Sequence, residues 1–230
     1  FAPMDLVSPF NPATIDTEYK PGVDAARIDI YAGMTTKFTL AAAYAGSWDL
    51  QGTVLAAYAQ TTVGLFDIGA FFGEIHGEHV FGLTTAGGIG PVGIHADATV
   101  TVSEDQGVFG RVVLGLNGTP TGTVFIGGEL YWQSLGGADP SEYLALATTD
   151  RFERGEMWTM GRYYAALNAS WQPYPTVGLG LGTVMNLADP SALISGSISW
   201  SIGGGVDLAI GANLSAGARP DEMTLADFLG

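Results

Sequence analysis

The chain has 230 residues, including 34 glycines and no cysteine; only 13% are charged, and the formal net charge is −15. Average proteins have about 25% charged residues, so few charges are available here to cover a surface in water. The lack of cysteine excludes disulfides and cysteine-based zinc sites. The eight Lys and Arg residues are too few for a nucleic acid partner, whose phosphates require basic side chains.

Twelve segments show alternation of apolar and polar residues, the pattern of a strand whose side chains point to opposite faces in turn. The segment 92–102 is a clear example: one face is Val, Ile and Ala, and the other carries small polar groups that include His95, Asp97 and Thr99. In chain order, the predicted strands are 24–32, 37–45, 52–59, 62–72, 79–86, 92–102, 108–116, 122–133, 161–171, 176–187, 191–202 and 205–216.

Most of these predicted strands are long enough to cross a membrane. A tilted transmembrane strand needs about 9–11 residues, whereas strands of soluble proteins average about 5–6. Tyr and Trp lie near several strand ends, as in the aromatic girdles of membrane barrels. Lipid leaves no partner for an open sheet edge. The predicted fold class is therefore all-β: an antiparallel up-and-down transmembrane β-barrel with about twelve strands present.

The predicted connections alternate in length. Those after the odd-numbered predicted strands are short, and Asn117-Gly118 in one of them is a tight-turn signal. Those after the even-numbered strands are expected to be longer and acidic; the longest covers 134–159. Transmembrane barrels have short periplasmic turns and long extracellular loops. We therefore expect 134–159 to be an extracellular loop and the loop side to carry a negative potential.

We expect one outer-membrane barrel domain over 1–230, with 1–23 as a loop. Both ends of a twelve-strand chain would lie on the long-loop side, so the intact barrel is expected to have at least one more strand at each end. The segment 2–31 resembles a loop-to-strand passage of uncharacterised porin-like bacterial outer-membrane barrels, through Pro3-x-Asp5-Leu6, Pro9-Phe10-x-Pro12, Gly22-x-Asp24 and Arg27. This resemblance implies a pore-like barrel and assigns no substrate or catalytic residue.

The polar faces of the predicted strands carry acids and bases in nearly equal number. Rings of charge determine selectivity in barrels, so these residues are the candidates for the channel lining. The predicted lumen-lining residues are Arg27, Asp29, Lys37, Asp67, His95, Asp97, Arg111, Glu129, Arg162, Tyr164 and Asp207. The predicted function is a porin-like channel for passive diffusion of small polar solutes, with a weak preference for cations.

Motifs for other chemistry are weak. Gly88-x-Gly90-x-x-Gly93 matches a dinucleotide fingerprint, but a strand rather than the required helix follows it. His95 and Asp97 are roughly 7 Å apart along a strand, too far for a catalytic hydrogen bond. A cluster in a predicted loop offers weak candidates for metal binding: Glu74, His76, Glu78 and His79.

We expect no enzymatic activity, no cofactor and no committed metal site. The expected partners are outer-membrane lipid, lipopolysaccharide, small polar solutes and divalent cations at the acidic loops. Two other functions stay open: a structural or adhesive outer-membrane barrel with a closed lumen, and an outer-membrane hydrolase. A soluble β-sandwich is the alternative fold.

Overall fold

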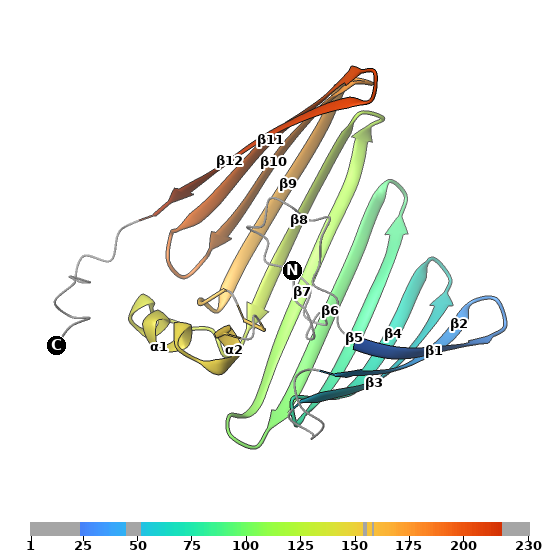
Figure 1. The fold of residues 1–230 in the computed structure, drawn as a ribbon, viewed down its shortest axis with the longest axis vertical. Helices are drawn as coiled ribbons and strands as arrows, with labels where there is room; N and C mark the ends of the chain where they lie inside the picture. The colour runs from blue at the N-terminus through green and yellow to red at the C-terminus, as the bar shows by residue number, and fades with distance from the viewer. Residues whose placement is uncertain (1–23, 45–51, 154–155, 158, 218–230) are drawn as a thin grey trace.

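A computed structural model describes residues 24–44, 52–153, 156–157 and 159–217. The described chain forms one antiparallel sheet of twelve strands in which each strand pairs with the next in sequence (Figure 1). This confirms the predicted number of strands and their up-and-down order. The strands are β1 (Asp24–Ala32), β2 (Thr36–Tyr44), β3 (Thr53–Val63), β4 (Phe66–Ile75), β5 (Glu78–Ile89), β6 (Val92–Ser103), β7 (Gly107–Thr121), β8 (Val124–Gln133), β9 (Tyr163–Tyr174), β10 (Val177–Asn186), β11 (Ala192–Gly203) and β12 (Val206–Ala216).

Within the described residues, helix is confined to the connection between β8 and β9. This connection holds a short 3-10 turn, η1 (Pro140–Glu142), followed by α1 (Tyr143–Ala147) and α2 (Asp150–Glu153). Within the described ranges, no helix has the length and apolar character needed to cross a membrane.

The sheet is open. β1 and β12 lie at its two opposite edges (Figure 1), and among the described residues each pairs with one neighbour only. The structure therefore shows the predicted sheet without the predicted closure into a barrel.

The strand register places apolar residues opposite apolar residues, so that they share one face across the whole sheet. Ile28 is opposite Leu40, Leu114 is opposite Leu130, and Ile198 is opposite Ile210. We call this side the apolar face and the side that carries His95 and Asp97 the polar face. The large side chains of the apolar face are exposed; Leu83, for example, is 63% exposed.

Several turns differ from prediction. Asn117-Gly118 does not form the β7–β8 turn: both residues lie within β7, which bulges between Gly118 and Thr121, and the turn is at Gly122 and Thr123. The turn after β3 is Gly64 and Leu65, four residues later than predicted, because β3 continues to Val63. Gly64 has a φ of 64°, a left-handed conformation that glycine adopts without strain.

The connections on the other side are not uniformly long. β4 and β5 are joined by His76 and Gly77 alone, and β6 and β7 by residues 104–106. The predicted loop that contained Glu74, His76, Glu78 and His79 is therefore a tight hairpin, since β4 and β5 extend further than their alternation indicated. Among the described connections, only 134–162 is long.

The buried side chains gather on the polar face, near the end where β8 leads into the 134–162 connection. Val54, Ile75 and Val80 form one cluster there. Val113, Tyr131 and Tyr164 form another. The helices of the 134–162 connection lie at this end of the sheet (Figure 1). The core is therefore on the polar side, whereas the apolar face has no covering layer in the described chain.

Candidate functional site

The polar face brings together the residues predicted to line a lumen. Ten of the eleven lie on it in strands, and Arg162 comes directly before β9. Several acids have partners on the same face. Asp29 pairs with Arg27 at 3.0 Å and accepts a hydrogen bond from Thr39. Asp67 accepts one from Thr62.

His95 and Glu129 form the central pair of this face. Nε2 of His95 lies 3.2 Å from Oε1 of Glu129, although β6 and β8 are separated by β7. The intervening residue opposite both is Gly115. A Cβ atom at this position would overlap the His95 ring. The missing side chain of Gly115 is therefore what allows the two groups to meet across a whole strand.

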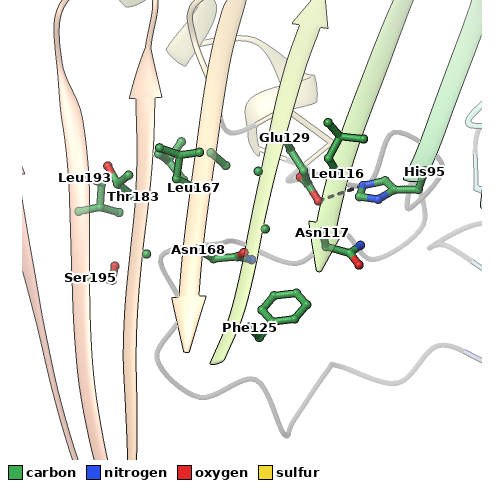
Figure 2. Close-up of a pocket in the computed structure, with 15 residues that line it drawn as sticks. His95, Leu116, Asn117, Phe125, Glu129, Leu167, Asn168, Thr183, Leu193 and Ser195 are labelled. Atoms are coloured by element: carbon green, nitrogen blue, oxygen red, sulfur yellow. Dashed lines mark hydrogen bonds and ion pairs between the residues drawn. The ribbon is translucent and has the colours of Figure 1, made fainter. Parts of the chain in front are cut away.

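A cavity of about 360 Å³ opens beside this pair. Figure 2 shows His95 and Glu129 on one side of it, Asn117, Phe125 and Asn168 around it, and Ser195 toward the far side. Its volume lies within the range of about 300–1,000 Å³ typical of small-molecule sites. It is lined by strands β6 to β11 and faces away from the apolar side.

Glycines on neighbouring strands leave the space in which the amide side chains of this cavity lie. Asn117 lies over Gly93, and Asn168 lies over Gly127; a Cβ atom at either glycine would overlap the amide oxygen. Ser197 and Ser199 lie in the same way over glycines of β10. The glycine-rich face therefore holds polar side chains flat against the sheet, rather than only leaving room for water.

A second cavity, of about 460 Å³, continues from the first toward the turn between β7 and β8. Phe125 lines both cavities. The second is lined by hydroxyl and amide groups, including those of Ser170, Gln172, Ser197 and Ser199, together with apolar side chains such as Trp171.

The connection 134–162 folds onto the polar face through Arg151. The guanidinium forms ion pairs with Glu78 at the start of β5 and, at 2.8 Å, with Glu156. It also donates to Gln106 at 2.8 Å and lies 4.5 Å from the ring centre of Phe109. The Arg151 side chain is only 7% exposed. Arg151 is therefore the centre of a buried network.

Other contacts attach the same connection to the sheet. Gln133, at the end of β8, donates to the carbonyls of Thr159 at 2.6 Å and Gly161 at 2.9 Å. Asn186 of β10 donates to the Tyr143 hydroxyl at 2.8 Å. The described residues of 134–162 therefore fold inward onto the polar face rather than forming a free loop.

Several acidic groups outside the strands are exposed, although the side chain of Glu156 is buried against Arg151. Glu104, Asp105, Glu142 and Asp150 are exposed at the end of the sheet that carries residues 134–162. Asp139 is exposed there too; its carboxylate accepts hydrogen bonds from the backbone N–H and hydroxyl of Ser141, which lower its pKa.

Arg111 is the other buried base of the polar face. Its exposure is 4%, and its guanidinium carbon lies 5.9 Å from the ring centre of Phe109. Its Nη2 has no hydrogen-bond partner within the part of the chain that the structure describes. Arg111 therefore contributes little direct contact to a solute in the cavities.

The weak metal candidates do not converge. Glu74 and His79 are opposite each other on the apolar face. Glu78 is on the other face, paired with Arg151, and His76 lies 3.9 Å from Glu156. Within the described residues there is no group of three or more potential ligands for a metal ion.

The residues around His95 do not form a Ser-His-acid site for nucleophilic catalysis. Ser195 lines the same cavity, but β6 and β11 are five strands apart, about 24 Å along the sheet at about 4.8 Å per strand. The partner of His95 is Glu129 rather than Asp97. A Ser-His-acid relay needs contacts within hydrogen-bond distance, and Ser195 is too far from His95 to make one.

Comparisons with known proteins yield no relative: no family model, curated protein or solved structure matches this chain. The resemblance to porin-like barrels, carried mainly by residues 3–22 in the segment 1–23, lies outside the described residues except for Asp24 and Arg27.

Sequence reasoning missed the cavity residues Asn117, Phe125 and Asn168, and the anchors Gln133 and Asn186. The available signal was a glycine opposite a polar residue on the next strand, as Gly127 is opposite Asn168. It becomes visible only once the register between strands is known.

Proposed function

We propose that the chain forms the wall of a bacterial outer-membrane β-barrel and acts as a porin-like channel for small polar solutes. The observation that carries this proposal is the exposed apolar face, which continues over all twelve strands. Soluble monomers seldom expose apolar patches larger than about 300–600 Å². Lipid is the partner that such a face fits without a second protein layer.

The sheet supports the proposal in two further ways. Ten of its twelve strands have 10 to 15 residues, and a tilted strand needs about 9–11 to cross a bilayer. The polar face carries the hydroxyl, amide and charged groups suited to a water-filled interior. In this proposal the edges of β1 and β12 are paired in the intact barrel, because lipid offers no other hydrogen-bond partner.

The end of the sheet that carries residues 134–162, which we call the acidic end, implies a weak preference for cations. Glu104, Asp105, Asp139, Glu142 and Asp150 are exposed there, while the Arg151 charge is neutralised by Glu78 and Glu156. The same carboxylates are candidates for bridging, through divalent cations, to lipopolysaccharide phosphates. The Debye length is about 8 Å at physiological salt, so the preference is expected to decline as salt increases.

Planar-bilayer recording of the full chain tests this function. We expect discrete conductance steps, and a reversal potential under a salt gradient that indicates cation preference at low salt with a chelator present. Absence of steps from protein that is folded in the bilayer would contradict the channel. Anion preference under the same conditions would contradict the account of the acidic end.

One observation favours a second candidate, a structural or adhesive barrel with a closed lumen. The inward-folded connection 134–162 is fixed to the polar face by buried contacts from β5, β8 and β10. A permanently closed lumen would give no conductance steps even when strand-face measurements show a correctly inserted barrel.

A further inference from the structure

The polar face of the sheet is divided by charge. The charged residues of this face are concentrated in β1 to β8, whereas β9 to β12 contribute one, Asp207. The two cavities share Phe125 of β8, next to this neutral part; His95 and Glu129 line the first cavity only, and among the described residues no charged one lines the second. We define the neutral track as Asn117, Phe125, Asn168, Ser170, Ser197 and Ser199.

The geometry points to a binding track for neutral polyhydroxylated solutes, such as saccharides, and we propose this as the substrate class of the channel. The inference rests on the proposed function for the transport step, but binding to the track is measurable without it.

Hydrogen-bond chemistry favours this class. Ser hydroxyls and Asn amides both donate and accept, as do the hydroxyls of a sugar, so a match does not depend on one orientation. Asn168 and Ser197 are held over glycines of adjacent strands, which limits the number of conformations that they lose on binding. Preorganised groups of this kind bind with less entropic cost.

Phe125 adds an apolar surface between the two cavities. A pyranose ring presents C–H groups on its faces and hydroxyls around its edge. An aromatic ring flanked by amides and hydroxyls complements both parts.

The absence of charge on the track also fits passage rather than retention. Neutral hydrogen bonds are about half as strong as charge-assisted ones. Conduction requires sites that a solute can leave as well as enter. A succession of weak neutral sites meets this condition, whereas the two charged groups beside the track, His95 and Glu129, are paired with each other.

The test measures binding of maltose to the detergent-solubilised full chain by saturation-transfer NMR. Maltose is expected to bind, and Asn168→Ala and Phe125→Leu are each expected to weaken the binding about fivefold, as for loss of about one hydrogen bond or ring contact. Asp67→Asn is the matched control on the charged part of the same face and should change the binding less than twofold. The double variant S197A/S199A, which deletes only two hydroxyls, provides a second measurement of maltose binding if a single variant fails to fold.

Three probes with one carbon skeleton test the substrate class. Glucose should bind at least as well as glucosamine, a cation, and glucuronate, an anion. Stronger binding of either ion, or maltose binding unchanged in the folded track variants, would overturn the proposal.

Conductance measured on the same preparation separates the two proposals. Ion current without maltose binding would contradict the proposed binding track and leave the proposed channel function intact. Maltose binding that depends on the track, without ion current, would support the track and contradict the channel.

Discussion

At the scale of single residues, the glycines of the polar face act by making room for a particular neighbour. Gly115 lets His95 reach Glu129, and Gly127 seats Asn168. Gly182 lies on the same face and has no atom within 4 Å of a Cβ placed on it. The first two glycines are therefore expected to be sensitive to substitution, and the third to be tolerant.

Gly115→Ala should destabilise the protein by about 1–3 kcal/mol, the usual cost of overpacking a close contact. The added methyl group displaces the His95 ring and separates it from Glu129. Denaturant unfolding from lipid vesicles measures the change. Gly182→Ala is the matched control and should unfold with unchanged or slightly higher stability. An equal loss in both variants would show that His95 is not seated by Gly115.

The two faces of β11 provide a second test at this scale. Ile198 lies on the apolar face and Ser197 on the polar face. An Arg on the lipid side near the bilayer midplane costs about 2–4 kcal/mol, so Ile198→Arg should reduce folding into liposomes far more than Ser197→Arg. The reverse order would mean that the faces are assigned the wrong way around.

At the scale of elements, the connection 134–162 is held mainly by buried polar contacts rather than by apolar packing. Its helices are short, with five residues in α1 and four in α2, too short to be stable alone. Arg151 links them to β5 and to the β6–β7 turn through Glu78 and Gln106. The position of the whole connection therefore depends on a small number of side chains.

Arg151→Gln should release this connection from the polar face. Removing one partner of a buried ion pair costs about 3–5 kcal/mol, because the remaining carboxylates are left uncompensated. We expect faster cleavage within 134–162 by a nonspecific protease and larger conductance steps.

The control for this variant is Arg27→Gln, which removes the exposed pair with Asp29. The Arg27 side chain is 58% exposed, and exposed pairs contribute about 0–1 kcal/mol. Unchanged protease protection in Arg151→Gln would show that the anchors Gln133 and Asn186 are sufficient to hold the connection.

At the scale of the whole molecule, the up-and-down order places successive connections on opposite sides of the sheet. The 134–162 connection is on one side, and the turn at Gly122 and Thr123 is on the other. In a barrel these sides face the cell exterior and the periplasm.

Epitope tags at the two sides test this topology. A tag after Thr148, which is exposed between α1 and α2, should bind antibody on intact cells. A tag at Gly122 should bind only after the outer membrane is permeabilised. Gly137 and Gly118 are unsuitable, because Gly137 is buried against Gly161 and Tyr143 and Gly118 lies within β7. Equal labelling at both tags would exclude the proposed topology.

The sequence alone determined the number of strands, their order and the residues of each face, because side-chain alternation is a local property of an extended chain. This is why Ile198 and Ser197 could be assigned to opposite faces without coordinates. Turn positions were less certain: strand pairing overrode the local signal at Asn117-Gly118, where a bulge carries β7 past the expected turn.

Only the tertiary structure decided which residues meet. The His95–Glu129 pair spans three strands, and the contact of Arg151 with Glu78 joins residues 73 positions apart. Such contacts depend on strand register and on the path of the 134–162 connection, neither of which is encoded in a local pattern. The seating of Asn168 over Gly127 has the same origin, since each residue is unremarkable until the sheet places one against the other.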